Sequence, residues 1–239
     1  LLRLMPNNRE ARLHLARMQI AAGDFDVAAA NLARLLASRS DDAVAGFTLG
    51  CLAFRNEQLA EGWSGYALRF DAGATNPAAP LSLPALKAER LTADLKQERI
   101  AVRPEASLKD QILFARWLTQ LRRDSGFVVG ELDPRLIPLL DQTTTRLSLF
   151  PTGSLQAEEA EDLQLTSQVA LGDLGAKYGL DFVSLGAAVP YLQFDRAKAA
   201  AMRRDYLAAL NAKRLIGLCW RGGDLAVPLS EWLPILQSG

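Results

Sequence analysis

Apolar residues recur at intervals of three and four positions between residues 9 and 70, and this spacing predicts a series of amphipathic helices. We predict helices at 9–22, 25–37, 41–54 and 59–70. Gly23 and Asp24 suit a tight turn between the first two helices, and Asp41 and Asp42 suit a cap on the third. We therefore expect the N-terminal segment to consist of antiparallel helix pairs.

The two predicted helix pairs repeat in sequence. A shift of 34 residues superposes Leu15 on Leu49, Ala16 on Gly50, Gln19 on Ala53, Ala28 on Gly62 and Leu32 on Tyr66. Small residues at matching positions let helix backbones approach closely, and this period is typical of tetratricopeptide repeats. Stacked pairs expose a groove that suits a polypeptide, and we expect Arg12, Gln19 and Asn56 in segment 1–72 to contact a partner.

The pattern changes after the repeats. Pro77, Pro80 and Pro84 interrupt any helix, which predicts a connector over 73–98. Trp63 and Tyr66 need a cover at the end of so short an array. We expect them to anchor the last repeat helix to the connector or to the following domain.

Strands and helices alternate in the second half of the chain. We predict strands at 99–103, 127–132 and 146–150, with helices at 108–123 and 134–140. Such alternation favours a parallel sheet with helical crossovers, hence a Rossmann-like layer over 99–212. A helix at 195–210 and a strand at 215–220 follow. We interpret 213–239 as the incomplete start of a second Rossmann-like half.

Composition excludes several classes of protein. The 239 residues are 49% hydrophobic and 23% charged, which is ordinary for a globular chain of two domains. The 27 basic and 27 acidic residues balance, so we expect no nucleic-acid partner. No apolar run suits a membrane span and the first residues lack a signal-peptide pattern, so we predict a cytoplasmic location. We also expect natural sequence before Leu1.

The two cysteines and the one histidine do not indicate a disulfide, a metal site or a catalytic site. Cys51 and Cys219 lie in different predicted domains, which argues against a disulfide or a zinc site, and we expect both to be buried. His14 is the one histidine and is expected to be a packing or surface residue. The sequence thus excludes a histidine-dependent mechanism within this chain and predicts no metal.

Four pieces of sequence carry a resemblance to a known family. They are EGWSGY at 61–66, the segment 104–116 with PE at its start and DQILFAR at its end, PRLIPLL at 134–140, and GLCWRGG at 217–223. In order and spacing these pieces resemble a bacterial family in which tetratricopeptide repeats precede a GT-B glycosyltransferase region. That family is related to heptosyltransferases and to O-linked N-acetylglucosamine transferases.

The resemblance implies both a fold and a site. The fold is α plus α/β: helical repeats followed by the N-terminal Rossmann-like half of a GT-B fold. The resemblance also implies inverting transfer from a nucleotide sugar, with Glu105 or Asp110 as the base. Trp220, Arg221 and the pair Gly222–Gly223 would approach the donor diphosphate, and no other cofactor is implied.

The chain departs from the family pattern in three places. The family loop Glu-Gln-Gly-Leu-Gly-Asp has Ser107 and Lys109 in place of its glycines, so Asp110 could instead cap or salt-bridge a helix start. The run at 168–174 stands where relatives often carry a histidine. Few residues follow Gly223, so we expect residues 1–239 alone not to turn over a nucleotide sugar.

Two functions remain open from the sequence. The first is a protein O-glycosyltransferase whose repeats present the acceptor. The second is a non-catalytic tetratricopeptide scaffold with a degenerate transferase-like docking domain, which the lost glycines favour. A dinucleotide enzyme is set aside because no G-x-G-x-x-G motif follows a predicted strand.

Overall fold

The computed structural model describes residues 5, 8–78, 81–141, 147–183, 191–211, 213–217 and 227–237. Contacts divide the chain into two units, Leu1–Gln193 and Phe194–Gly239. The first unit holds both the repeat helices and an α/β layer. The sequence-based boundary at 212 differs from this division, because the helix predicted at 195–210 belongs to the second unit.

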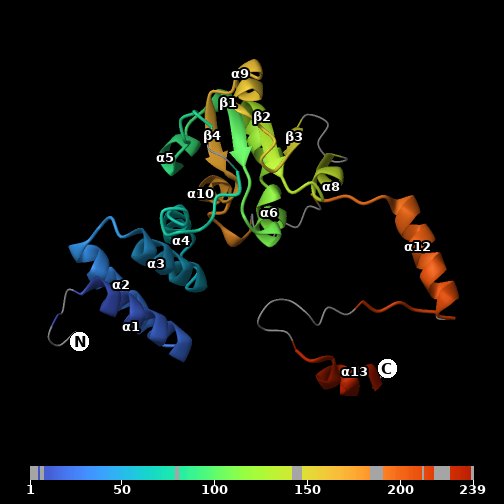
Figure 1. Cartoon of the computed structure of the whole chain (residues 1–239), viewed down its shortest axis with the longest axis horizontal. Coiled ribbons are helices and arrows are strands. Elements are labelled where there is room, and N and C mark those ends of the chain that lie inside the picture. Colours follow the sequence, from blue (N-terminus) through green and yellow to red (C-terminus); the bar gives the residue numbers. More distant parts are fainter. Residues whose placement is uncertain are drawn as a thin grey trace. The chain divides into compact units, whose positions relative to one another are not determined.

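The four helices predicted between residues 9 and 70 are present (Figure 1). They are α1 (Arg9–Ala22), α2 (Phe25–Ser38), α3 (Ala43–Arg55) and α4 (Leu59–Tyr66). Gly23 ends α1 with a φ of 87°, and the Asp42 carboxylate caps α3 by accepting the Ala45 N–H at 3.0 Å. The predicted helix 59–70 ends early, because Leu68 and Arg69 donate their N–H groups to carbonyls three residues back and so form tight turns.

The buried face of the repeats differs from the sequence prediction at two positions. Leu15 is 38% exposed, because the buried stripe of α1 runs through Leu13 and Ala16. Cys51 is exposed as well, since it lies on α3 opposite the buried residues Ala45 and Ala53. His14 is a surface residue, and Cys219 lies outside the described residues.

A pair of glycines sets the closest approach of α3 and α4. A Cβ atom built on Gly50 would lie 2.6 Å from the Cα atom of Gly65, and one built on Gly65 would lie 2.5 Å from the Cα atom of Gly50. The small residue predicted at position 50 therefore does allow close packing. Its neighbour is Gly65, whereas a Cβ on Gly62 would meet the ring of Phe54.

We expect Gly50→Ala to lower the free energy of unfolding by about 1–3 kcal/mol, because the two helix backbones must separate. This loss exceeds the roughly 1 kcal/mol by which alanine is the better helix former. Urea denaturation followed by circular dichroism measures the change. Gly217→Ala is the control, since a Cβ there meets nothing within 4 Å. Equal stability of Gly50→Ala and the wild type would contradict the close approach.

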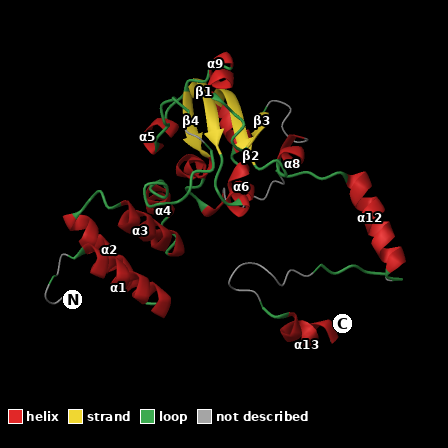
Figure 2. Ribbon diagram, in the orientation of Figure 1, coloured by secondary structure: helices red, strands yellow, loops and turns green. Residues whose placement is uncertain are grey.

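The α/β layer contains a four-stranded sheet in which every pair is parallel (Figure 2). The strands are β1 (Leu95–Arg103), β2 (Ser125–Leu132), β3 (Ser148–Pro151) and β4 (Ser167–Ala170), in the order β3-β2-β1-β4. The predicted alternation is confirmed for the first three strands, and β4 was not predicted. This order is that of the first four strands of doubly wound α/β folds.

Short helices connect and cover the strands. They are α5 (Ala88–Leu91), α6 (Leu108–Ala115), α7 (Leu118–Asp124), α8 (Ile137–Asp141), α9 (Ala157–Asp162), the 3₁₀ helix η1 (Leu171–Leu174) and α10 (Gly175–Tyr178). The single helix predicted at 108–123 is interrupted at Arg116 and Trp117. Fully buried residues of β1, β2, α7 and η1 form the core between sheet and helices, among them Ile100, Val128 and Leu118.

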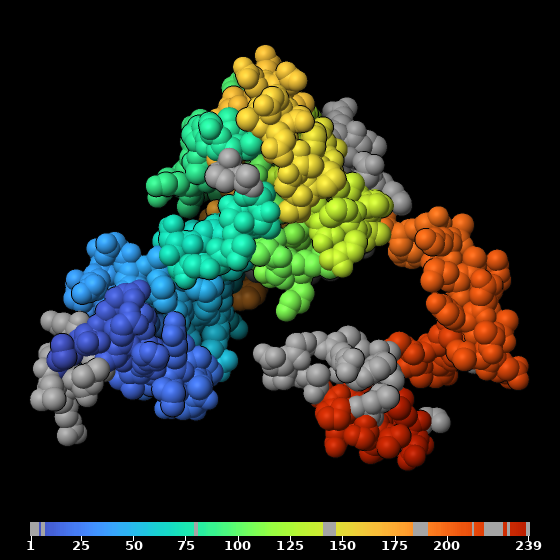
Figure 3. All heavy atoms as spheres, viewed as in Figure 1, coloured from blue at the N-terminus to red at the C-terminus, as the bar shows by residue number. Residues whose placement is uncertain are grey.

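The connector follows the free side of β4. Gln168 of β4 donates from Nε2 to the carbonyls of Leu81 and Leu83, both at 2.8 Å, and exchanges main-chain hydrogen bonds with Pro84 and Leu86. In the space-filling view the segment after α4 lies against the spheres of the α/β layer (Figure 3). The connector thus covers an otherwise unpaired sheet edge.

The second unit has α12 (Arg196–Ala209), the 3₁₀ helix η2 (Leu229–Trp232) and α13 (Leu233–Gln237). The predicted helix is confirmed as α12. The strand predicted at 215–220 is wrong at its start, because Leu215, Ile216 and Gly217 pair with no strand among the described residues and Ile216 is 76% exposed. The donor residues expected from the resemblance, Trp220, Arg221, Gly222 and Gly223, lie outside the described residues.

Candidate active site

The strand order creates a topological switch point between β1 and β4. From β1 the chain crosses to β2 and β3 on one side, and then returns to β4 on the other. In open α/β sheets, ligands bind outside the carboxyl edge at such a point. Glu105 follows β1 and Asp173 follows β4, so two acidic residues meet at this edge.

Arg69, which follows the last repeat helix α4, joins both acidic residues. Its Nε and Nη2 atoms donate to the two carboxylate oxygens of Glu105 at 2.9 and 2.5 Å. Its Nη1 atom donates to Asp173 at 2.5 Å. The side chains of Arg69 and Glu105 are only 3% and 4% exposed, whereas that of Asp173 is 26% exposed. A guanidinium presents donors in a fork that matches this two-carboxylate arrangement.

Glu105 is fully engaged by its neighbours. Besides Arg69, its Oε1 atom accepts the N–H of Gly172 at 2.8 Å. Its main-chain carbonyl accepts Gln111 Nε2 at 2.6 Å, and Gln111 in turn accepts the N–H of Asp133 at 2.7 Å. These bonds hold the loop after β1, the loop after β4 and the end of β2 together. Glu105 could reach an acceptor hydroxyl only by breaking its buried ion pair.

Asp110, the other predicted base, is half-buried in the first turn of α6. Burial, followed by the charge of Glu105, raises the pKa of Asp110 above its ordinary value. A raised carboxyl pKa suits a general base near neutral pH. The cap of α6 is Ser107, whose hydroxyl accepts the Lys109 N–H at 3.2 Å, so Asp110 does not serve that purpose.

The loop from Glu105 to Asp110 does not need the glycines of the resembled family. Ser107 has a φ of −91° and a ψ of 130°, an extended conformation that any residue adopts. Among the described residues, positive φ values occur outside this loop. Replacement of the family glycines therefore causes no backbone strain here.

The predicted anchor of the last repeat helix is confirmed. Trp63 is 8% exposed and donates from Nε1 to the Gly179 carbonyl at 2.7 Å. Its ring lies edge-on to those of Phe54, Phe114 and Trp117, at centroid distances of 4.7, 5.8 and 5.4 Å. Tyr66 joins the same cluster. The last repeat helix and the α/β layer thus share one apolar core.

A second buried ion pair lies between neighbouring strands. The Arg103 guanidinium at the end of β1 lies 2.7 Å from the Glu131 carboxylate of β2, whose side chain is fully buried. The other carboxylate oxygen of Glu131 accepts the N–H groups of Gly153 and Leu155 at 2.9 and 3.1 Å. The sequence analysis did not predict this ion pair. It could have been suspected because Arg103 and Glu131 each lie at the end of an apolar run.

The predicted partner contacts have different surroundings. Arg12 donates to the buried Asn31 at 3.1 Å, and Asn31 donates to Gln19 at 3.4 Å. These bonds join α1 to α2 within the first helix pair. Asn56 is exposed at the end of α3. Only Asn56 of the three is thus fully presented to solvent.

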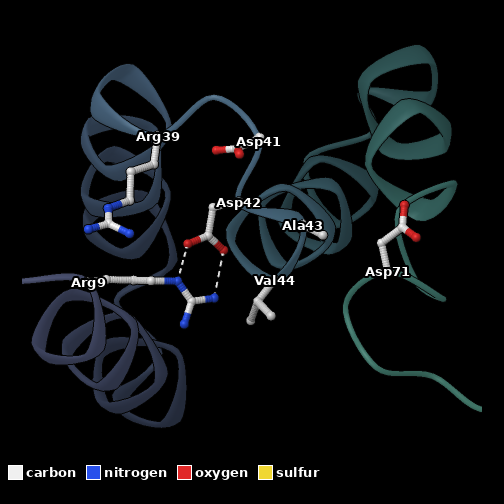
Figure 4. A pocket seen from close by; sticks show the side chains of 7 residues that line it. All are labelled: Arg9, Arg39, Asp41, Asp42, Ala43, Val44 and Asp71. Atoms are coloured by element: carbon white, nitrogen blue, oxygen red, sulfur yellow. Dashed lines mark hydrogen bonds and ion pairs between the residues drawn. The ribbon is translucent and has the colours of Figure 1, made fainter.

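A polar cavity of about 290 Å³ lies beside the start of α3 (Figure 4). Arg9 extends from α1 to Asp42 and binds both of its carboxylate oxygens, one of them at 3.1 Å. Arg39, Asp41 and Asp71 also line the cavity. The hydrogen bond from Arg9 holds the pKa of Asp42 below its ordinary value of 3.8.

We expect Asp42→Ala to lower the free energy of unfolding by about 1–2 kcal/mol at pH 7, because the helix cap and the ion pair are lost together. Since the folded-state pKa of Asp42 is depressed, its contribution is present above pH 3.8 and is lost as pH falls through the folded pKa. The difference between wild type and variant should therefore shrink in acid. Urea denaturation at pH 7 and pH 3 measures it, with Asp41→Ala as the exposed control. A difference independent of pH would argue against this pairing.

Within the described ranges, no group of three or more histidine, cysteine, aspartate or glutamate residues is arranged to hold a metal ion. No helix in the same part of the chain is both long and apolar enough to cross a bilayer. Comparison with protein-family models, with curated proteins and with solved structures gave no match.

Proposed function

We propose that this chain belongs to a tetratricopeptide protein O-glycosyltransferase, in which the repeats present a polypeptide acceptor to the α/β layer. One observation carries the proposal: Arg69 and Trp63 fix the last repeat helix to the carboxyl edge at the switch point. A polypeptide held by the repeats would then lie at a constant distance from that edge. Such fixed positioning is what a transfer between two bound substrates requires.

The proposed reaction is an inverting transfer. The acceptor hydroxyl oxygen attacks the anomeric carbon of a nucleotide sugar, and the bond from that carbon to the diphosphate oxygen breaks, with its electron pair leaving on the diphosphate. The hydroxyl proton passes to a carboxylate, for which Asp110 is the better candidate because Glu105 is engaged by Arg69. The resemblance assigns the diphosphate to Arg221 and to the N–H groups of Gly222 and Gly223.

The second candidate function is a scaffold. It is favoured by the burial of Glu105, which turns one of the two predicted bases into a structural group. In this case the α/β layer would support the repeats, and no nucleotide would be released from a nucleotide sugar.

The test is a transfer assay on the complete gene product with UDP, GDP, CMP and ADP sugars and a serine- and threonine-containing polypeptide. The glycosyltransferase proposal expects nucleotide release that depends on acceptor, and a loss of at least about 100-fold in kcat on Asp110→Asn. Asp41→Asn is the exposed control and should leave the rate unchanged. Polypeptide binding without nucleotide release would support the scaffold, and full activity of Asp110→Asn would rule out the proposed base.

A further inference from the structure

Anchoring of the last repeat helix does not by itself explain why Arg69 is buried against two carboxylates. The last repeat helix is already fixed by Trp63, through an aromatic cluster and a hydrogen bond to Gly179. Buried ion pairs are inefficient anchors, because the desolvation of both charges offsets much of their attraction. The position of Arg69 points instead to its two partners, Glu105 and Asp173, at the candidate catalytic edge.

The three carboxylates at this edge, Glu105, Asp173 and Asp110, differ in how they are hydrogen-bonded. Arg69 occupies both oxygens of Glu105 and one oxygen of Asp173. Gly172 takes a further lone pair of Glu105. Asp110 is half-buried in the first turn of α6, shortly after Glu105 in the chain, and in the described part of the chain its carboxylate accepts no hydrogen bond.

Three charged groups act on Asp110. Glu105 lies in the loop before α6, and Lys109 is its neighbour on α6. Arg69 comes from the segment after α4. Glu105 raises the pKa of Asp110, whereas Lys109 and Arg69 lower it. One of the groups that set the charge state of Asp110, Arg69, therefore belongs to the repeat segment.

We propose that Arg69 is a positioning residue of the catalytic edge: it withdraws Glu105 from proton transfer, offsets part of the negative charge of the edge, and leaves Asp110 as the carboxylate that meets the acceptor hydroxyl. The last step rests on the proposed function, whereas the charge coupling among Arg69, Glu105 and Asp110 does not. The repeat segment thereby contributes to the chemistry of the edge as well as to acceptor binding.

The coupling is tested by titrating the Asp110 carboxyl carbon by NMR in the folded protein. Arg69→Met removes a nearby cation, so the Asp110 midpoint should move to higher pH. Adding Glu105→Gln removes a nearby anion and should return the midpoint to the wild-type value or below. Arg69→Lys keeps the charge and should leave the midpoint close to that of the wild type. Arg90→Met is the matched control, because Arg90 forms an exposed ion pair with Glu98.

A midpoint that is the same in the wild type and in folded Arg69→Met would overturn the proposal. If Arg69→Met does not fold, Glu105→Gln alone decides, because it should lower the Asp110 midpoint and an unchanged value would again overturn the coupling. These readouts need no enzymatic activity. They therefore separate a failure of the positioning role from a failure of the proposed function.

Activity supplies the second readout where transfer is found. Arg69→Lys keeps a cation but lacks the fork that holds Glu105 and Asp173, so the edge is misplaced. We expect kcat to fall on the order of tenfold to 100-fold, with the KM for the nucleotide sugar unchanged. An equal change in KM with kcat retained would contradict a positioning role.

Discussion

Trp63→Ala is expected to lower the free energy of unfolding by about 3–5 kcal/mol, the range for truncating a buried aromatic side chain. Trp63 fills the space between α4, α6 and α10, where Gly175 and Gly179 lie directly against its ring. The substitution would leave a cavity between the repeats and the α/β layer. Urea denaturation followed by intrinsic fluorescence and circular dichroism measures the loss.

Two further variants separate the contributions of Trp63. Trp63→Phe keeps a ring but removes the donor to the Gly179 carbonyl, and should cost about 1–3 kcal/mol for a buried acceptor left unsatisfied. Met18→Ala, at a residue that is 69% exposed on α1, should change stability by no more than about 0.5 kcal/mol. A Trp63→Ala protein as stable as Met18→Ala would show that the aromatic cluster does not join the two segments.

Glu131→Ala is expected to cost about 3–5 kcal/mol, because it leaves the Arg103 guanidinium buried without its carboxylate. It also removes the acceptor for the N–H groups of Gly153 and Leu155, so the loop after β3 should loosen. Urea denaturation gives the energy, and amide hydrogen exchange at Leu155 reports on the loop.

The double variant Arg103→Met with Glu131→Leu is the matched comparison for Glu131→Ala. It replaces both charges by apolar side chains of similar length, so the buried cation and its desolvation penalty disappear together. We expect it to be more stable than Glu131→Ala. If the double variant were less stable than the single one, the cost would come from packing and not from the loss of the ion pair with Glu131.

The spacing of apolar residues predicted the four N-terminal helices, and short apolar runs predicted the first three strands, two of which end in consecutive buried residues. Strand β4 was missed because it is short and begins with Ser167 and Gln168, whose polar side chains conceal a buried strand. The extent of the helix predicted at 108–123 was wrong, since no proline or glycine marks the interruption at Trp117.

The candidate site was predictable only in part. Glu105 and Asp110 were found through the resemblance, but Arg69, which binds only the first of them, was not. Arg69 lies 36 residues from Glu105 and 104 residues from Asp173 along the chain, so no local pattern indicates the cluster. Only the fold brings the end of α4 to the edge between β1 and β4.

The aromatic cluster around Trp63 also limits where the chain can be truncated without damage to the α/β layer. Trp63 and Tyr66 belong by sequence to a repeat and by packing to the sheet, so removal of residues 1 to 72 would strip the cover from α6 and α10. Binding assays with that truncation would report damage to the sheet instead of the loss of a binding surface on α1 to α4. A truncation that removes α1 and α2 should place the junction in the turn before Asp42 and keep α3 and α4 together with the α/β layer.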